Sequence, residues 1–148
     1  MIKRLLATAL LSPLAVAMFS IASATEAAAS TPLCTGPGNV FRGSSGDLAV
    51  PVVVSSNDPT CLIGNGLVGS HAAVTILQET FQACFPGQLA PGFSVDGNWG
   101  PITRQTLINV QHAINTDGTV NADGIYGPIT RNHMRFQSND VGGRCFHY

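Results

Sequence analysis

The sequence predicts a mainly α-helical protein, in which a three-helix bundle with two pseudo-repeats follows an extended N-terminal arm that disulfides tie to it. Three observations support this fold class. A nine-residue segment recurs 27 residues further along the chain, apolar residues follow each copy at helical spacing, and the chain contains four cysteines. The predicted divisions are a leader, the arm, the helical domain and a tail, at residues 1–29, 30–60, 61–138 and 139–148.

Residues 1–29 have the order of segments that is typical of a secretory signal peptide. A short basic start is followed by an apolar run from 5 to 21, and small residues end the segment. Ser12-Pro13 interrupts the apolar run, which argues against a membrane anchor. We therefore expect a secreted protein that has no membrane contact once the signal is removed.

The charge that remains after this cut is low. Cleavage after Ala29 leaves 119 residues with five arginines, seven acidic residues and no lysine. Nucleic acids and anionic membranes select for a basic face, so neither is an expected partner. A chain of this length can bury one hydrophobic core, and we expect a single, monomeric domain.

The arm, residues 30–60, contains more loop signals than regular structure. Pro37-Gly38, the glycine-serine segment 43–46 and Asp58-Pro59 surround one extended run from Leu48 to Val54. The arm is too short to fold alone, so we expect it to be held against the helical body. The tail after Ser138 is likewise predicted to be a loop.

Three segments are each predicted to form a helix with a mainly apolar face. Ser70 is a candidate N-cap for the first segment, and prolines open the other two. The helices are expected at 70–83, 101–114 and 128–137, with faces formed by Val74, Leu77, Phe81 and Cys84; by Leu107, Val110 and Ile114; and by Ile129, His133 and Phe136.

The second and third helices each follow one copy of the recurring segment. Both copies contain Asp-Gly and then Gly-Pro-Ile-Thr-Arg, with an aromatic residue in the same slot. Aspartate before glycine is typical of a tight turn, because the carboxylate accepts bonds from nearby amides and glycine accepts a positive φ. Each copy is therefore predicted to be a turn that starts a helix. The turn residues are Asp96, Gly97, Gly100, Pro101 and Thr103, and then Asp123, Gly124, Gly127, Pro128 and Thr130.

All four cysteines lie beyond the leader, which predicts two disulfides in an exported chain. The residues are Cys34, Cys61, Cys84 and Cys145. Three pairings are possible, and the sequence does not choose among them. No two cysteines stand two to four residues apart, so the spacing argues against a metal site. We expect neither a metal nor a cofactor.

The turn motif and its surroundings resemble a known family. Leu77-Gln78, the segment from Val95 to Arg104, and Val110-Gln111 resemble the peptidoglycan-binding domain that is often attached to bacterial cell-wall hydrolases, and the second turn is similar to the second half of that domain. Cys61-Leu62-x-Gly64-x-Gly66 and Cys84 also resemble a small secreted four-cysteine subgroup. The chain departs from the family pattern in the loop after Gln82, which is longer, and at Phe136-Gln137. The resemblance implies non-catalytic binding of the stem peptide or glycan of peptidoglycan.

Four side chains of the turns are candidates for contact with such a ligand. The rings of Trp99 and Tyr126 can stack on sugar or peptide faces, although both can instead pack on the following helix. Arg104 and Arg131 suit carboxylates, although they can instead pair with the turn aspartates. The turn aspartates and threonines are expected to hold the turns, and Gln78 and Gln111 to bond loop backbone.

An enzyme is disfavoured by the residues available for catalysis. The turn aspartates occupy equivalent positions, unlike a glycosidase acid–base pair, and the four histidines show no H-x-x-x-H pattern. A cell-wall hydrolase is therefore the least favoured hypothesis for the function. The main alternative is a secreted protein–protein interaction module or hydrolase inhibitor, which predicts an apolar surface patch that involves Phe85, Phe93 or Phe146.

Overall fold

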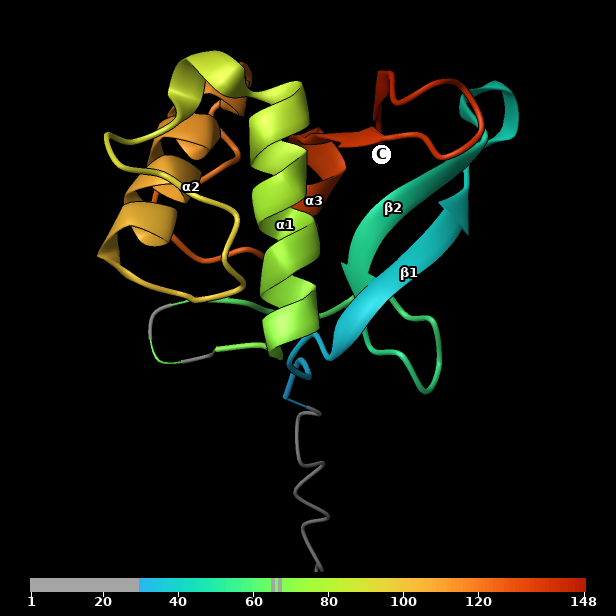
Figure 1. The fold of residues 1–148 in the computed structure, drawn as a ribbon, viewed down its shortest axis with the longest axis horizontal. Helices are drawn as coiled ribbons and strands as arrows, with labels where there is room; N and C mark the ends of the chain where they lie inside the picture. Colours follow the sequence, from blue (N-terminus) through green and yellow to red (C-terminus); the bar gives the residue numbers. More distant parts are fainter. Residues whose placement is uncertain (1–29, 65, 67) are drawn as a thin grey trace, which may run out of the picture.

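The structure is a computed structural model that describes residues 30–64, 66 and 68–148. The predicted signal peptide, residues 1–29, lies outside them. Helix α1 (His71–Cys84) stands in the middle of the molecule, with α2 (Pro101–Ile114) on one side and a β-hairpin on the other (Figure 1). Helix α3 (Pro128–His133) lies behind α1 in this view. The first helix therefore has to bury two sides.

Helix α1 begins where its sequence predicts. The Ser70 hydroxyl accepts a hydrogen bond from the Ala73 amide at 3.1 Å, which satisfies one of the amides that a helix start leaves without a partner. The predicted stripe of Val74, Leu77 and Phe81 is fully buried. Burial of each such side chain contributes about 1.5–3 kcal/mol relative to its exposure, so this stripe anchors the core.

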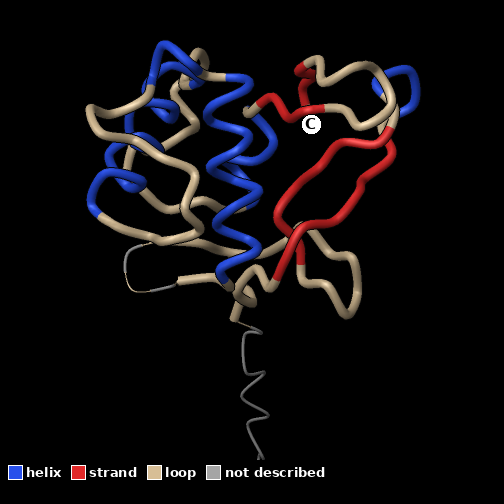
Figure 2. The backbone as a smooth tube through the Cα atoms, viewed as in Figure 1, coloured by secondary structure: helices blue, strands red, loops and turns tan. Residues whose placement is uncertain are grey.

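The prediction of a mainly α-helical bundle is wrong. The described chain holds three α-helices together with two small antiparallel sheets, and 34% of it is helix against 22% strand (Figure 2). The first sheet joins β1 (Gly36–Phe41) to β2 (Asp47–Val52), and the second joins β3 (Arg135–Gln137) to β4 (Cys145–His147). Short 3₁₀ turns lie at Gly43–Ser45 and Pro86–Gln88.

The arm forms a hairpin because its glycine-serine segment is a tight connection between two extended stretches. Asn39 pairs with Ala49 and Val40 with Leu48 in the antiparallel register. Residues from Gly36 onward were predicted to be loop because of Pro37-Gly38, but β1 is an edge strand, where a missing N–H is tolerated. The hairpin then lays the apolar face of β2 on α1.

The third helix ends earlier than predicted, at His133 rather than Gln137. Met134 adopts an extended conformation, with φ −79° and ψ 160°, and Phe136 enters the core from a strand instead of from a helix face. Phe136 pairs with Phe146 of the tail, which was predicted to be loop. Strands of three residues carry too short a pattern to be recognised in the sequence, so only the folded chain reveals this pair.

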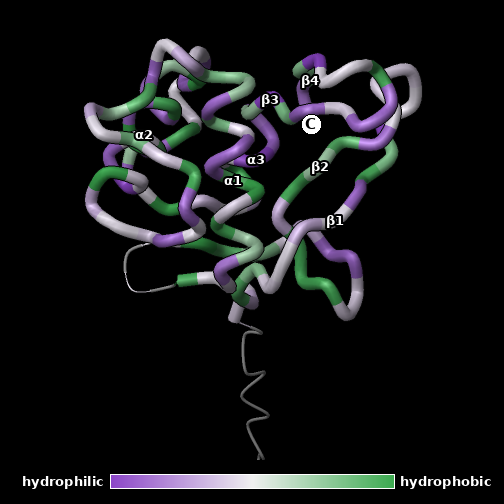
Figure 3. Tube along the Cα trace, in the orientation of Figure 1, coloured by the Kyte–Doolittle hydropathy of each residue, from purple (hydrophilic) through white to green (hydrophobic). Residues whose placement is uncertain are grey.

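The core is built from both the helices and the hairpin. Leu48, Val50 and Val52 of β2 are fully buried beside α1, and hydrophobic residues line this strand in Figure 3. On the far side, Leu107 and Val110 of α2 are also fully buried. The arm is therefore part of the hydrophobic core rather than an appendage.

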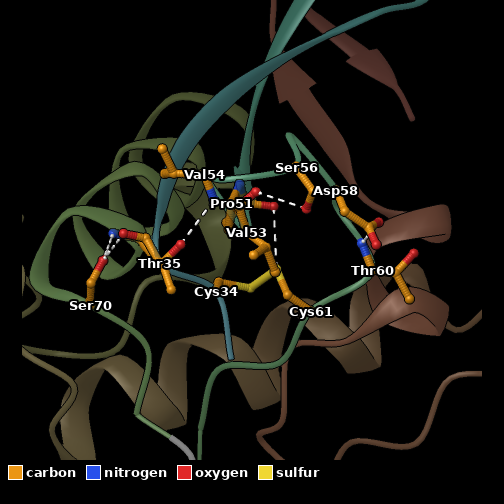
Figure 4. The surroundings of a disulfide bond; sticks show 11 residues. Cys34, Thr35, Pro51, Val53, Val54, Ser56, Asp58, Thr60, Cys61 and Ser70 are labelled. Carbon is orange, nitrogen blue, oxygen red and sulfur yellow. Dashed lines mark hydrogen bonds between the residues drawn. A yellow bond between two sulfur atoms is a disulfide. The ribbon is translucent and has the colours of Figure 1, made fainter. Parts of the chain in front are cut away.

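The first disulfide, Cys34–Cys61, joins the start of the arm to the segment that precedes α1 (Figure 4). Close to it, the Ser70 hydroxyl donates to the Thr35 carbonyl at 2.6 Å, and the Ser70 amide donates to the Cys34 carbonyl at 3.0 Å. Ser70 thus caps α1 and binds the arm with the same side chain, which fixes where the helix begins relative to the hairpin.

The second disulfide, Cys84–Cys145, joins the last residue of α1 to β4. The aromatic ring of Tyr148 lies between two guanidinium groups, 3.8 Å from that of Arg42 and 4.3 Å from that of Arg131, so it links the hairpin end to α3. Two disulfides indicate an oxidising compartment. Across the described part of the chain, every helix is too short or too polar to cross a membrane.

Candidate functional site

The first Asp-Gly turn is held by one buried glutamine of α1. The Gln78 side-chain amide donates to the Asp96 carboxylate at 2.9 Å and to the Asn98 carbonyl at 3.1 Å. Its carbonyl oxygen accepts from the Gly97 amide at 2.7 Å. Asp96 also accepts from the Asn98 amide at 2.9 Å, which closes the turn.

The second turn makes the same contacts with a glutamine of α2. Gln111 donates to the Asp123 carboxylate at 3.1 Å and to the Ile125 carbonyl at 2.9 Å, and it accepts from the Gly124 amide at 2.9 Å. A threonine completes each network, Thr103 with Gln78 and Thr130 with Gln111, both at 3.1 Å. The two glutamines bond the turns and are fully buried, so they do not face a ligand.

Both turns require glycine after the aspartate. Gly97 and Gly124 have φ values of 68° and 72°, which side chains rarely adopt. A Cβ atom at Gly97 would also collide with the His71 ring, and one at Gly124 would lie 2.8 Å from Cγ of Arg104. His71 and Arg104 each stand seven residues before the glutamine of their helix. Each turn is therefore clamped between two residues of the preceding helix.

Hydrogen bonds keep the first carboxylate ionised. The Asn98 backbone amide and the Gln78 side chain hold the pKa of Asp96 below its ordinary value of 3.8. The charge of Asp96 is thus stabilised by the turn itself, which leaves this aspartate poorly suited to act as a catalytic acid.

The two aromatic rings have different surroundings. Trp99 is half-buried and packs beside Gly64, where an added Cβ would lie 3.0 Å from the indole. Tyr126 is fully buried, so its ring packs inside the fold and presents no face to a ligand in this structure. Its backbone pairs with Ile63 in both directions, and its ring lies edge-on to Phe136 at 6.5 Å. Burial raises the pKa of the Tyr126 hydroxyl.

The two arginines also differ in their burial and their partners. Arg104 is half-buried and donates from Nη2 to the Asp123 carbonyl at 2.8 Å, so it ties α2 to the second turn. Arg131 is only 8% exposed, and it donates to the Asn132 side chain and stacks on Tyr148. The tail therefore covers the Arg131 guanidinium, which does not line the cleft described below.

An open cleft of about 610 Å³ lies beside the first turn. It brings together two of the four predicted ligand contacts, Trp99 and Arg104. The indole offers a flat apolar face, and the guanidinium offers donors in a planar fork. The lining residues are Gly66, Trp99, Gly100, Pro101, Arg104 and Gln105.

Each turn also carries a smaller hollow made from equivalent positions. The volumes are about 120 Å³ at the first turn and about 180 Å³ at the second. Ile102 and Ile129, which are 45% and 59% exposed, line them. The matching residues are Asp96, Asn98 and 100–103 in one, and Asp123, Ile125 and 127–130 in the other.

The apolar patch expected of a protein–protein module does not form at the predicted phenylalanines. Phe85 is only 5% exposed, and Phe93 and Phe146 are half-buried and pack against the core. Phe93 lies edge-on to Phe81 at 6.3 Å. These rings therefore stabilise the fold.

An ion pair that the sequence reasoning missed joins the loop after α2 to α3. Nε2 of His133 lies 3.1 Å from the Asp117 carboxylate, and Nδ1 lies 2.9 Å from the Ile129 carbonyl. The Ile129 carbonyl and then Asp117 raise the pKa of His133 above 6.5. Hydrogen bonds from Thr119, with a smaller effect of His133, lower the pKa of Asp117 to about 2. Sixteen residues separate the pair, so no local motif identifies it.

We expect Asp117→Asn to lower the pKa of His133, because the substitution removes a neighbouring negative charge. The stability that His133 contributes is present below its ordinary pKa of 6.5 and is lost as pH rises through the raised value. The contribution of Asp117 is present above 3.8 and is lost as pH falls toward about 2. The pair therefore stabilises most between these two ordinary values.

An NMR titration of the His133 ring protons measures this change directly. Asp140→Asn is the matched control, because Asp140 bonds the Asp47 amide at the start of β2 and is not a partner of His133. An unchanged pKa of His133 in Asp117→Asn would contradict the ion pair.

Within residues 30–64, 66 and 68–148, no group of three or more His, Cys, Asp or Glu side chains is placed to hold a metal ion. No protein-family model matches this chain, and no curated protein or solved structure matches it either.

Proposed function

We propose that this secreted protein binds bacterial peptidoglycan in the cleft beside Trp99, without cleaving it. The observation that carries the proposal is that a half-buried indole and a guanidinium line the same open cleft of about 610 Å³. The resemblance of both turns to the peptidoglycan-binding domain family supports the choice of ligand.

The chemistry of the cleft suits a stem peptide or an adjoining sugar. The Trp99 ring can stack on a sugar ring or a peptide plane, and it has few rotamers to lose on binding. A guanidinium matches the planar carboxylates that end stem peptides. Gln105 is exposed and adds an amide that can both donate and accept.

Hydrogen bonds hold two groups of the cleft in place before a ligand arrives. Gln78 fixes the turn that carries Trp99, and Arg104 is fixed through its bond to the Asp123 carbonyl. Groups that are already ordered lose little conformational entropy on binding. This favours affinity for a repetitive polymer whose individual units bind weakly. The described residues that line the cleft carry no carboxylate, imidazole or thiol, which supports binding rather than catalysis.

Co-sedimentation of the oxidised chain from residue 30 with purified sacculi tests the proposal. We expect the wild type to pellet and Trp99→Ala to raise the dissociation constant about tenfold, the loss of about 1.4 kcal/mol of stacking and apolar contact. Phe41→Ala is the matched control, because it removes a 72% exposed ring from β1, outside the cleft. Circular dichroism checks that each variant is folded.

Three results would contradict the proposal in different ways. Failure of the wild type to pellet above an albumin control would remove peptidoglycan as the ligand. Equal binding by the wild type and Trp99→Ala would show that the ligand binds outside the cleft. Release of soluble wall fragments would show that the protein is a hydrolase.

A further inference from the structure

A second pocket lies at the other end of α2 from the Trp99 cleft. Its volume is about 400 Å³, within the range of about 300–1,000 Å³ that is common for small-molecule sites. The end of α2, the loop after α1, α3 and the β3–β4 sheet all contribute to it. The lining residues are Phe85, Gln88, Ala113, Ile114, Thr116, Asn132, His133, Arg135 and His147.

Arg135 makes the pocket cationic, and two imidazoles lie beside it. The guanidinium of Arg135 in β3 is permanently charged, and His133 and His147 line the same pocket. The Ile129 carbonyl accepts a hydrogen bond from Nδ1 of His133, and this bond raises the pKa of that ring. Nε2 bonds Asp117, so both ring nitrogens of His133 already have partners. No carboxylate is among the described residues that line the pocket, and Asp117 approaches only through its ion pair with His133.

Arg135 is oriented by the protein around it. Its Nη2 donates to the Cys84 carbonyl at 3.1 Å, and its guanidinium lies 5.4 Å from the Phe85 ring. A guanidinium has five N–H donors, and the Cys84 carbonyl takes only one of them. The Cys84–Cys145 disulfide joins the two segments that carry Phe85 and His147, so both sides of the pocket are held together.

The remaining surface of the pocket is partly apolar. Phe85, Ala113 and Ile114 contribute hydrocarbon next to the cationic groups. A bare inorganic anion would leave this apolar surface without a partner. An aliphatic compound without charge would leave the remaining N–H donors of Arg135 without a partner.

We propose that this pocket binds an organic carboxylate, in which the anionic group meets Arg135 and His147 and a short aliphatic group meets Phe85 and Ile114. The C-terminal residue of a peptide and a free branched-chain acid share this chemistry. The site is separate from the Trp99 cleft, and its occupancy does not depend on peptidoglycan binding.

The experiment is an NMR titration of the ¹⁵N-labelled oxidised chain with N-acetyl-leucine and with its uncharged amide. We expect the acid to shift amides around the pocket and to bind at least about tenfold more tightly than the amide. N-acetyl-alanyl-leucine separates the two natural sources, because a peptide terminus should bind at least as tightly as the single residue. The Trp99→Ala variant should bind the acid normally.

Substitutions test the cationic groups. Arg135→Gln and His147→Gln should each weaken binding of the acid several-fold, whereas Arg144→Gln, an equal loss of charge at an exposed tail residue, should not. His147 is exposed, so His147→Gln remains informative if Arg135→Gln fails to fold. Raising the pH from about 5.5 to about 8 should also weaken binding, since His133 beside the pocket loses charge while Asp117 and the ligand stay ionised.

Equal affinity for the acid and the amide would overturn the proposal, because the pocket would then be merely apolar. Equal shifts with inorganic phosphate would overturn it as well, because they would show unspecific attraction of anions. Absence of shifts around the pocket with either leucine compound would remove the site.

Discussion

Replacing Cys84 and Cys145 together with alanine should lower the free energy of unfolding by about 4 kcal/mol. The two cysteines are 61 residues apart, so the disulfide restricts a long loop of the unfolded chain. Cys84 is also 5% exposed at the end of α1, and the bond holds the only strand that pairs with β3 in the described sheet. We therefore expect a global loss of stability.

Urea denaturation followed by circular dichroism measures this loss. The Cys34→Ala, Cys61→Ala variant is the comparison, because its shorter separation of 27 residues predicts a loss of about 3.5 kcal/mol. Hydrogen exchange distinguishes the opposite outcome. If the first variant lost less than about 1 kcal/mol and only the β3–β4 amides lost protection, the disulfide would hold the tail alone.

Gln78→Ala should lower the free energy of unfolding by about 3–4 kcal/mol. The substitution leaves the Gly97 amide without its acceptor and the Asp96 carboxylate without its side-chain donor, and each loss costs about 1–3 kcal/mol. Gln78→Glu should be at least as damaging, since it places a second carboxylate where the amide now lies 2.9 Å from Asp96.

Two further glutamines provide controls for this prediction. Gln111→Ala should have an effect of the same size, because the second turn makes matching bonds. Gln105→Ala should change the stability little, since Gln105 is exposed and bonds only the Asn109 side chain on the same helix. A small effect at both Gln78 and Gln111 would show that the turns fold without them.

Local signals in the sequence predicted the starts of all three helices. Ser70 and the two prolines act within a few residues, and the structure places α1, α2 and α3 where these signals stand. The turn aspartates and glycines are also local, and their geometry follows from residue type. These features depend on neighbours in the chain, which is why one sequence is sufficient to find them.

The missed features depend on partners outside the segment that was interpreted. The arm becomes a strand pair because α1 offers an apolar face, and Phe136 enters the core from β3, which pairs with the nearby β4. Tyr126 and Trp99 occupy the same slot of the recurring segment, yet Ile63 and Phe136 cover only Tyr126. A motif therefore predicts the turn but not which of its two copies stays open to solvent.

The burial of β2 against α1 has a practical consequence for anyone who wishes to transplant the two turns into another protein. A fusion that carries only residues 61–138 would leave behind Leu48, Val50 and Val52, which are fully buried in the native chain. It would also lose the carbonyl of Thr35 that anchors the Ser70 hydroxyl. The smallest transferable piece therefore starts upstream of Cys34. A fusion that begins at Cys61 would expose the apolar side of α1 and aggregate.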